Sequence, residues 1–294
     1  MIAVLFDNGG TLTDDPFEDA IAMLRQEHAL ADLDARGLPR GLSDRFLELW
    51  SEENDRHSFP FASHFIQEET WIGRALLRLG EAEGAPDAGD VPDLAPRILR
   101  RYRAAVRRLV AAQPQVGSLT NVLRMLKERG CAVGVASNDR TFATRALMAW
   151  TGYASYMDFI LVSEELSTAS ERIEKPDPHF FTKAIERLRE RGVAPSRLIY
   201  VGDSEANDVA TPRALGFTTV RYINPNNPKS RTWLDHSQTT AADFAYRSVG
   251  DLAALFATIL DGTSSAARAD SLTSPRPRER LVGGDGIEPP TSTV

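Results

Sequence analysis

The feature that most constrains the fold is a regular alternation, after residue 117, of short apolar runs with amphipathic segments of helical length. The predicted strands lie at residues 131–136, 159–162, 197–201 and 218–223. The helical segments lie at residues 118–129, where Ser118 is a suitable N-cap, and at 140–151, 178–192, 205–215 and 250–261. Strands that alternate with helices of this length are typical of a parallel sheet covered on both faces. We therefore predict an α/β fold with a doubly wound, Rossmann-like parallel sheet.

The amino-terminal segment fits the same sheet. Residues Ile2–Phe6 form a continuous apolar run that ends at Asp7, which is the pattern expected of a buried parallel strand. Because this strand and the later alternation share one pattern, residues 1–13 and 117–262 are predicted to form a single α/β core domain.

Residues 14–116 have a different character, because their apolar residues recur with helical spacing and show no strand pattern. Helices are expected at residues 16–30, 43–58, 63–80 and 92–113. We predict that residues 14–116 form an all-helical cap domain inserted after the first strand. Residues 263–294 are rich in Ser, Arg, Pro, Gly and Thr without apolar periodicity, so we expect a disordered tail there.

Four polar clusters lie beside the predicted strands or helix starts, and ligands of open parallel sheets bind at the carboxyl ends of the strands. The clusters are Asp7 to Gly10, Ser137 to Asp139, Lys175 to Pro178, and Gly202 to Asp208. Any one of them taken singly could be a turn or a helix cap. The last is harder to explain in that way, because its pattern Gly-Asp-Ser-x-x-Asn-Asp specifies five residues directly after an apolar run.

The residue types in these clusters indicate phosphate chemistry. Hard carboxylate oxygens of the kind that bind Mg2+ are available from Asp7, Asp203 and Asp208. Hydrogen-bond donors and one positive charge, suited to phosphate oxygens, are available from Ser137, Asn138 and Lys175. A carboxylate can attack phosphorus only where the negative charges are screened, and a metal ion with a lysine provides that screening.

With these clusters in this order, the chain resembles the haloacid dehalogenase-like superfamily, in the subgroup with a helical cap of the C1 type, over about residues 1–262. The resemblance implies that Asp7 is the catalytic nucleophile and forms an aspartyl-phosphate. It implies that Lys175 assists catalysis and that the phosphate is bound by Asn8, Gly10, Ser137, Asn138 and Lys175. It implies a Mg2+ cofactor held by Asp7, the carbonyl of Gly9, Asp203 and Asp208.

One position departs from the family pattern. Phosphatases that resemble this chain usually carry a second Asp two residues after the nucleophile, as general acid and base, and here that residue is Gly9. Another group could substitute, such as Asp14, Asp15, a cap residue or the substrate. The leaving group could need no acid, as in an acyl phosphate. Turnover could also be slow, which would leave a non-catalytic phosphate-binding or regulatory protein.

Two related reactions also dispense with that Asp. The phosphonate-cleaving members use a cap lysine, and this chain has no lysine in its predicted cap, since the four lysines are Lys127, Lys175, Lys183 and Lys229. The haloacid dehalogenases need no metal and carry Tyr or Phe in the first motif. The glycine at position 9 and the acidic Asp203 make phosphate hydrolysis the favoured interpretation.

The overall composition sets limits on partners. A net charge of −7 and a pI of about 5.4 argue against binding to nucleic acid, which relies on a basic surface. No apolar stretch is long enough to span a bilayer, and the amino terminus has no signal-peptide pattern, so we expect a cytoplasmic protein without membrane attachment. The expected partner is a small phosphorylated substrate, and the sequence predicts no particular oligomeric state.

Overall fold

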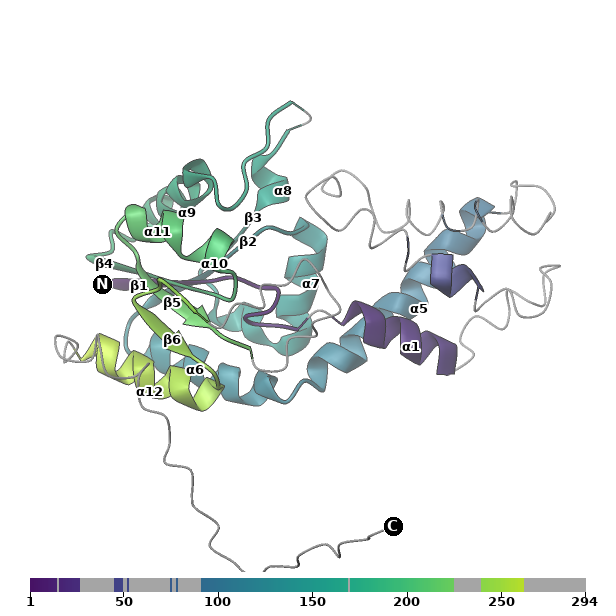
Figure 1. Cartoon of the computed structure of the whole chain (residues 1–294), viewed down its shortest axis with the longest axis horizontal. Helices are drawn as coiled ribbons and strands as arrows, with labels where there is room; N and C mark the ends of the chain where they lie inside the picture. Colours follow the sequence, from purple (N-terminus) through teal and green to yellow (C-terminus); the bar gives the residue numbers. More distant parts are fainter. Residues whose placement is uncertain are drawn as a thin grey trace, which may run out of the picture.

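The computed structural model describes residues 1–14, 16–26, 45–49, 52, 75, 78, 91–168, 170–224 and 239–261. Its centre is a six-stranded sheet with the order β3-β2-β1-β4-β5-β6, in which each strand runs parallel to its neighbours (Figure 1). The strands are β1 (Ile2–Phe6), β2 (Ala132–Ser137), β3 (Phe159–Val162), β4 (Arg197–Gly202), β5 (Thr218–Tyr222) and β6 (Phe244–Tyr246). The predicted parallel sheet is confirmed.

Helices cover both faces of the sheet. Successive strand residues point to opposite sides, so β1 supplies apolar side chains to both faces. On one face, Val4 and Phe6 of β1 belong to a buried apolar cluster with α6 (Gln115–Glu128) and α12 (Val249–Leu260). On the other face, Ala3 and Leu5 belong to a second cluster with Phe180 and Phe181 of α9 (Pro178–Glu190). The remaining elements of the core are α7 (Thr141–Thr151), η3 (Tyr153–Tyr156), α8 (Ser163–Leu166), α10 (Glu205–Asp208) and α11 (Ala210–Ala214).

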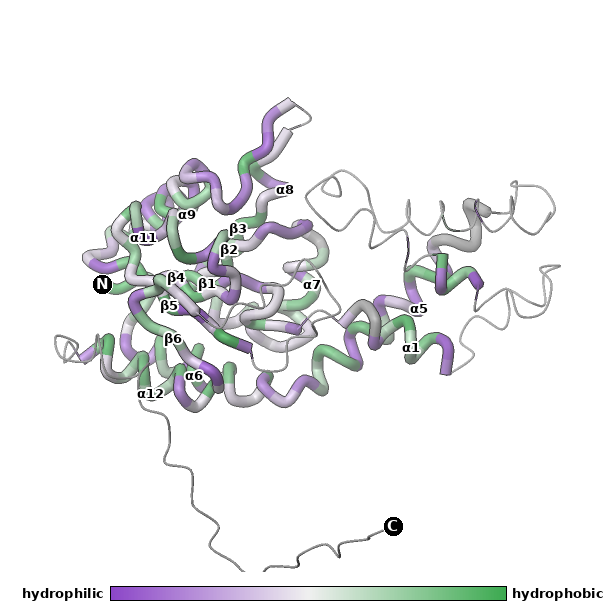
Figure 2. The backbone as a smooth tube through the Cα atoms, viewed as in Figure 1, coloured by the Kyte–Doolittle hydropathy of each residue, from purple (hydrophilic) through white to green (hydrophobic). Residues whose placement is uncertain are grey.

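The segment between β1 and β2 contains α1 (Phe17–Gln26) and the long α5 (Val91–Ala111), which lie beside the sheet (Figure 1). Hydropathy alternates along both helices, as expected for amphipathic helices (Figure 2). Their apolar sides form a separate buried cluster that includes Leu24 and Leu99 and also contacts Trp150 of α7. Residues 45–49 are helical too, but most of the helices predicted at 43–58 and 63–80 lie outside the described residues. The limits 14–116 for a cap domain stay a prediction.

The two places where the chain passes between the sheet and this helical segment are joined by hydrogen bonds. The side-chain amide of Gln113 donates to the main-chain oxygen of Asp14 at 3.0 Å, and its oxygen accepts from the Asp14 main-chain nitrogen at 3.3 Å. Gln115 donates to the Asp14 carboxylate at 2.8 Å. The entry to the helical segment is therefore held to its exit.

Several predicted boundaries differ from the structure. Helix α6 begins at Gln115 behind Pro114, so Ser118 lies inside the helix and does not cap it; proline suits a helix start because its lack of an N–H costs nothing there. The helix predicted at 205–215 is two short helices that meet at Val209. Strand β6 was not predicted. No helix in the described part of the chain is long and apolar enough to cross a membrane.

Candidate active site

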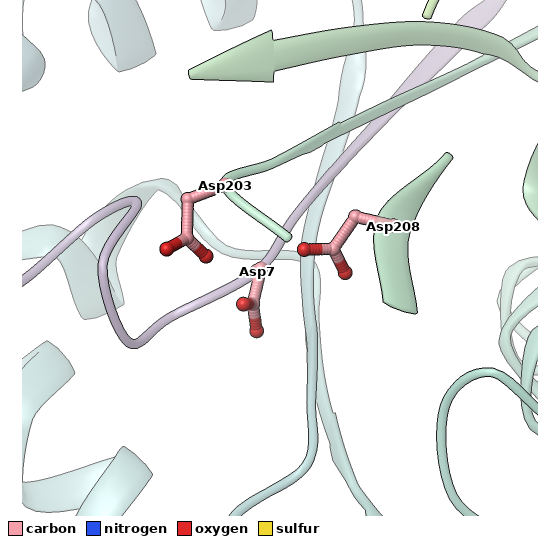
Figure 3. A group of neighbouring side chains, drawn as sticks. All are labelled: Asp7, Asp203 and Asp208. Atoms are coloured by element: carbon pink, nitrogen blue, oxygen red, sulfur yellow. The ribbon is translucent and has the colours of Figure 1, made fainter. Parts of the chain in front are cut away.

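Three of the predicted ligands meet at the carboxyl end of the sheet. Asp7 directly follows β1, Asp203 directly follows the neighbouring strand β4, and Asp208 ends α10 (Figure 3). Each offers a carboxylate oxygen that lies within 4.8 Å of the other two. All three side chains are buried, since Asp7 and Asp203 are 7% exposed and Asp208 is 2% exposed. The sheet order thus brings together residues from the first and last of the predicted clusters.

Lys175 joins this group from the loop before α9. Its Nζ lies 2.7 Å from Oδ1 of Asp208, to which it donates a hydrogen bond, and 2.8 Å from Oδ1 of Asp7. The second contact is an ion pair without hydrogen-bond geometry, because Oδ1 of Asp7 has no hydrogen-bond partner among the described residues. Burial alone would lower the pKa of Lys175, but the charges of Asp208 and Asp7 outweigh it and raise this pKa well above its ordinary value. Lys175 is therefore a buried cation that touches the predicted nucleophile.

Burial and neighbouring charges raise the pKa of two of these carboxyl groups, Asp203 and Asp208. Burial raises the pKa of Asp203 well above its ordinary value, and the charges of Asp7 and Asp208 raise it further. Burial also raises the pKa of Asp208 to about 6, with the charge of Asp7 acting in the same direction and Lys175 opposing both. Three carboxyl groups face one lysine here, so full ionisation of all three would leave an excess of negative charge in a buried space.

A divalent cation fits this group of residues. Its ligands would be the carboxylate oxygens of Asp7, Asp203 and Asp208, which are of the hard type that Mg2+ prefers. The buried Oδ1 of Asp7 receives no hydrogen bond among the described residues, although Lys175 lies 2.8 Å from it, so it can accept a further cation. A positive ion would also lower the raised pKa values of Asp203 and Asp208.

Two glycines allow the carboxylates to come this close. Gly10 has a φ of +76°, and a Cβ placed there would lie 2.7 Å from Cγ of Asp203. A Cβ on Gly202 would overlap the carboxyl group of Asp208. Glycine is required at both positions because the space that a side chain would occupy belongs to a predicted metal ligand. The N–H of Gly10 donates to the Thr13 carbonyl at 2.8 Å, so any phosphate contact through it stays a prediction.

Gly9 lies in open space. No heavy atom comes within 4 Å of a Cβ built there, and its backbone is outside the left-handed region. The proposed substitute Asp14 is exposed and accepts hydrogen bonds from Gln115 and, at 3.4 Å, from Asn224. Asp15 lies outside the described residues. The position of the usual second Asp is thus empty and accessible to a side chain.

The two predicted asparagines hold other parts of the site. The Asn138 side chain accepts from the main-chain nitrogen of Lys175 at 2.7 Å and donates to its main-chain oxygen at 2.8 Å. The Asn8 side chain donates to Asp139 at 3.3 Å and accepts from Thr13 at 3.1 Å. Both amides therefore bind protein groups, and a phosphate contact from either residue would fall to its main chain. Ser137 ends β2 and is 4% exposed.

The sequence did not single out two polar groups near the site. The Thr11 hydroxyl is buried and has no hydrogen-bond partner among the described residues. The Arg221 side chain is 1% exposed and donates from Nε to the main-chain oxygen of Asp203 at 3.0 Å. The available signal for Arg221 was a charged residue in the middle of a predicted strand, between Val220 and Tyr222, since a charge is buried only where it has partners.

The chain is similar to known proteins. A family model described as haloacid dehalogenase-like hydrolase matches residues 1–216. A phosphoglycolate phosphatase of Xanthomonas campestris is 29% identical over 222 residues, which is 75% of this chain and 82% of that protein. A ribulose-1,5-bisphosphate 5-phosphatase of Halopiger xanaduensis is 29% identical over 170 residues, or 58% of this chain and 65% of that protein.

A solved structure of a 2-haloacid dehalogenase from Pseudomonas syringae is also similar, with a TM-score of 0.52 and 25% identity over 88% of this chain and 100% of that one. The family model covers the first strand and all four polar clusters. The chain therefore belongs to the haloacid dehalogenase-like hydrolases.

Proposed function

We propose that this hydrolase is a Mg2+-dependent phosphatase that acts on a small phosphorylated metabolite through an aspartyl-phosphate on Asp7. The observation that carries the proposal is the contact between Asp7 and the buried cation Lys175 inside a group of three carboxylates. The two relatives named as phosphatases, of phosphoglycolate and of ribulose-1,5-bisphosphate, support the same substrate class.

In this proposal a carboxylate oxygen of Asp7 attacks the phosphorus atom and the bond to the leaving oxygen breaks. The leaving oxygen takes a proton from solvent or from the substrate. Water then attacks the phosphorus of the aspartyl-phosphate, which releases inorganic phosphate and regenerates the Asp7 carboxylate. The Lys175 ammonium, 2.8 Å from Asp7, stabilises the negative charge that collects around the phosphoryl group.

Bound Mg2+, held by Asp7, Asp203, Asp208 and the Gly9 carbonyl, would neutralise charge on the phosphate and on the carboxylates. Ser137 and the main-chain groups of Asn8, Gly10 and Asn138 would contact the phosphoryl oxygens. The Asn138 side chain would position Lys175, because it forms hydrogen bonds with both the main-chain nitrogen and the main-chain oxygen of that residue.

Carbon–halogen hydrolysis is a second candidate, favoured by the similarity to the 2-haloacid dehalogenase. The same Asp7 would then attack carbon and displace halide. The buried carboxylates argue for the phosphatase, because three mutually close carboxylates suit a cation and a haloacid brings none. A non-catalytic phosphate-binding protein is the third hypothesis. It rests on Gly9, which lacks the side chain that would act as general acid and base.

The test is release of inorganic phosphate from a panel of phosphorylated metabolites that includes 2-phosphoglycolate, with Mg2+ and with EDTA. We expect metal-dependent release by the wild type and none by Asp7→Asn, whereas the surface change Asp261→Asn should leave the rate unchanged. A parallel assay follows halide release from 2-chloropropionate. Halide release without phosphate release would overturn the phosphatase, and tight phosphate binding without turnover would establish the binding protein.

A further inference from the structure

Arg221 is the large charged side chain buried most completely in the described part of the chain. It lies on β5, where its Cα is paired with that of Gly202, the residue before Asp203. Only 1% of the residue is exposed. A guanidinium is not buried without a set of acceptors, because its desolvation would otherwise be too costly. Its partners therefore indicate what the residue does.

The partners of Arg221 surround the turn that carries Asp203. Nε donates to the main-chain oxygen of Asp203 at 3.0 Å. Nη1 donates to the Glu205 carboxylate at 3.0 Å and to the main-chain oxygen of Thr239 at 2.6 Å. One rigid planar group thus binds the residue that offers a metal ligand, the first residue of α10, and the segment that leads into β6.

Glu205 extends this set of contacts. One of its carboxylate oxygens accepts from the Thr240 hydroxyl at 2.6 Å, and the other accepts from the main-chain nitrogen of Ala241 at 2.8 Å. Arg221 and Glu205 together tie the turn after β4 to residues 239–241. Within the turn itself, the Ser204 N–H donates to the Asp208 carboxylate at 3.0 Å.

We propose that Arg221 is a positioning residue for the metal site: by holding the Asp203 carbonyl and Glu205, it fixes the turn that presents the Asp203 carboxylate to Mg2+. This inference rests on the Mg2+ site of the proposed function. The reason is geometric: the Asp203 carboxylate is attached to its Cα through a single methylene group, so the position of the main chain that Arg221 anchors limits where the carboxylate can reach. Residues that orient metal ligands in this way contribute to affinity without touching the metal.

The test measures metal affinity directly, without turnover. Mg2+ is titrated calorimetrically into the full chain, in the wild type and in Arg221→Met, which removes the donors and keeps the bulk. We expect the dissociation constant for Mg2+ to rise by about 10- to 100-fold. The matched control is Arg197→Met, because Arg197 also donates to a main-chain oxygen, that of Ile259 at 3.0 Å, but lies at the opposite end of β4. The control should bind Mg2+ as the wild type does.

A purely structural role is separated from positioning by melting curves. In EDTA both arginine variants should have a lower Tm, whereas only Arg221→Met should lose the rise in Tm that Mg2+ causes in the wild type. Arg221→Lys keeps the charge with a single nitrogen, and it serves where the methionine variant does not fold. A lysine variant, or a methionine variant, with wild-type Mg2+ affinity would overturn the proposal.

The failure of this inference differs from that of the proposed function. A wild type that binds Mg2+ and releases phosphate, together with an Arg221→Met variant that matches Arg197→Met, overturns the positioning role alone. A wild type that binds no Mg2+ overturns the metal site and this inference together.

Discussion

Replacing Gly10 with alanine tests the packing of the site at a single carbon atom. The residue has a φ of +76°, and its missing Cβ would lie 2.7 Å from Cγ of Asp203, whereas ordinary contacts begin at 3.4 Å. Two effects are therefore expected. A left-handed backbone costs a non-glycine residue about 1–2 kcal/mol. The Cβ also displaces the Asp203 carboxyl group from its present place beside Asp7 and Asp208.

Gly130→Ala separates these two effects. Gly130 has a φ of +70°, close to that of Gly10, but nothing lies within 4 Å of its added Cβ. The left-handed backbone should cost both variants about 1–2 kcal/mol of unfolding free energy in urea with EDTA present, and the contact with Asp203 should make the loss larger in Gly10→Ala. Only Gly10→Ala should in addition bind Mg2+ more weakly, by about 10- to 100-fold, and it should lose phosphate release by roughly 100-fold, the effect of moving a reacting group by about 1 Å.

The assays are urea unfolding followed by circular dichroism, Mg2+ titration by calorimetry, and phosphate release at saturating Mg2+. The reasoning is refuted if Gly10→Ala matches Gly130→Ala in both stability and Mg2+ affinity. In that case the carboxylate of Asp203 would have room to move without loss, and its close approach to Gly10 would have no part in metal binding.

Three further perturbations probe the same site. Lys175→Met should lower the unfolding free energy in EDTA by about 3–5 kcal/mol because it leaves buried carboxylates unpaired. The control Lys183→Met breaks an exposed pair with Glu186 and should cost at most about 1 kcal/mol, and equal losses in urea unfolding would contradict the buried pair. Gly9→Asp should raise the rate of phosphate release from alkyl phosphates by about 10²- to 10⁴-fold, and from 4-nitrophenyl phosphate much less, since only a poor leaving group needs an acid. A lower rate on both substrates would show that the glycine suits a specific reaction. In the metal-free protein the Asp208 pKa is raised from 3.8 to about 6, so between these pH values the folded state keeps a proton that the unfolded state has lost, and stability falls as pH rises. Asp208→Asn should therefore gain stability relative to the wild type between about pH 4 and pH 6. A difference in unfolding free energy that stays constant over this range would refute the assignment.

The sheet could be predicted because its strands are read from local patterns. Buried parallel strands are continuous apolar runs, and Ile2–Phe6 and Phe159–Val162 have the bounds that the sequence indicated. The polar residues that follow such runs also had to meet, because parallel strands place their carboxyl ends at one edge. This is why Asp7 and Asp203 could be expected in one site before any distance was known.

What a side chain binds within that site could not be read in the same way. Asn138 was predicted to bind phosphate, but its amide binds the main chain of Lys175, and that choice depends on the path of a loop 37 positions away. The role of Arg221 could not be predicted because its hydrogen-bond acceptors come from other segments of the chain, which the strand pattern around it does not reveal. Strand β6 is only three residues long, too short for its alternation to stand out from a turn.

The pairing of β1 with β4 has a consequence for how the protein is made. Asp7 leaves the ribosome before either neighbouring strand of β1, because β4 is completed about 200 positions later and the whole helical segment is synthesised in between. Strand β1 therefore cannot pair with either neighbour until the helical segment has been synthesised, since β2 also follows it. Affinity for Mg2+ should accordingly arise late in synthesis, only after Asp208 has emerged, and chains released earlier would have no metal site to stabilise them.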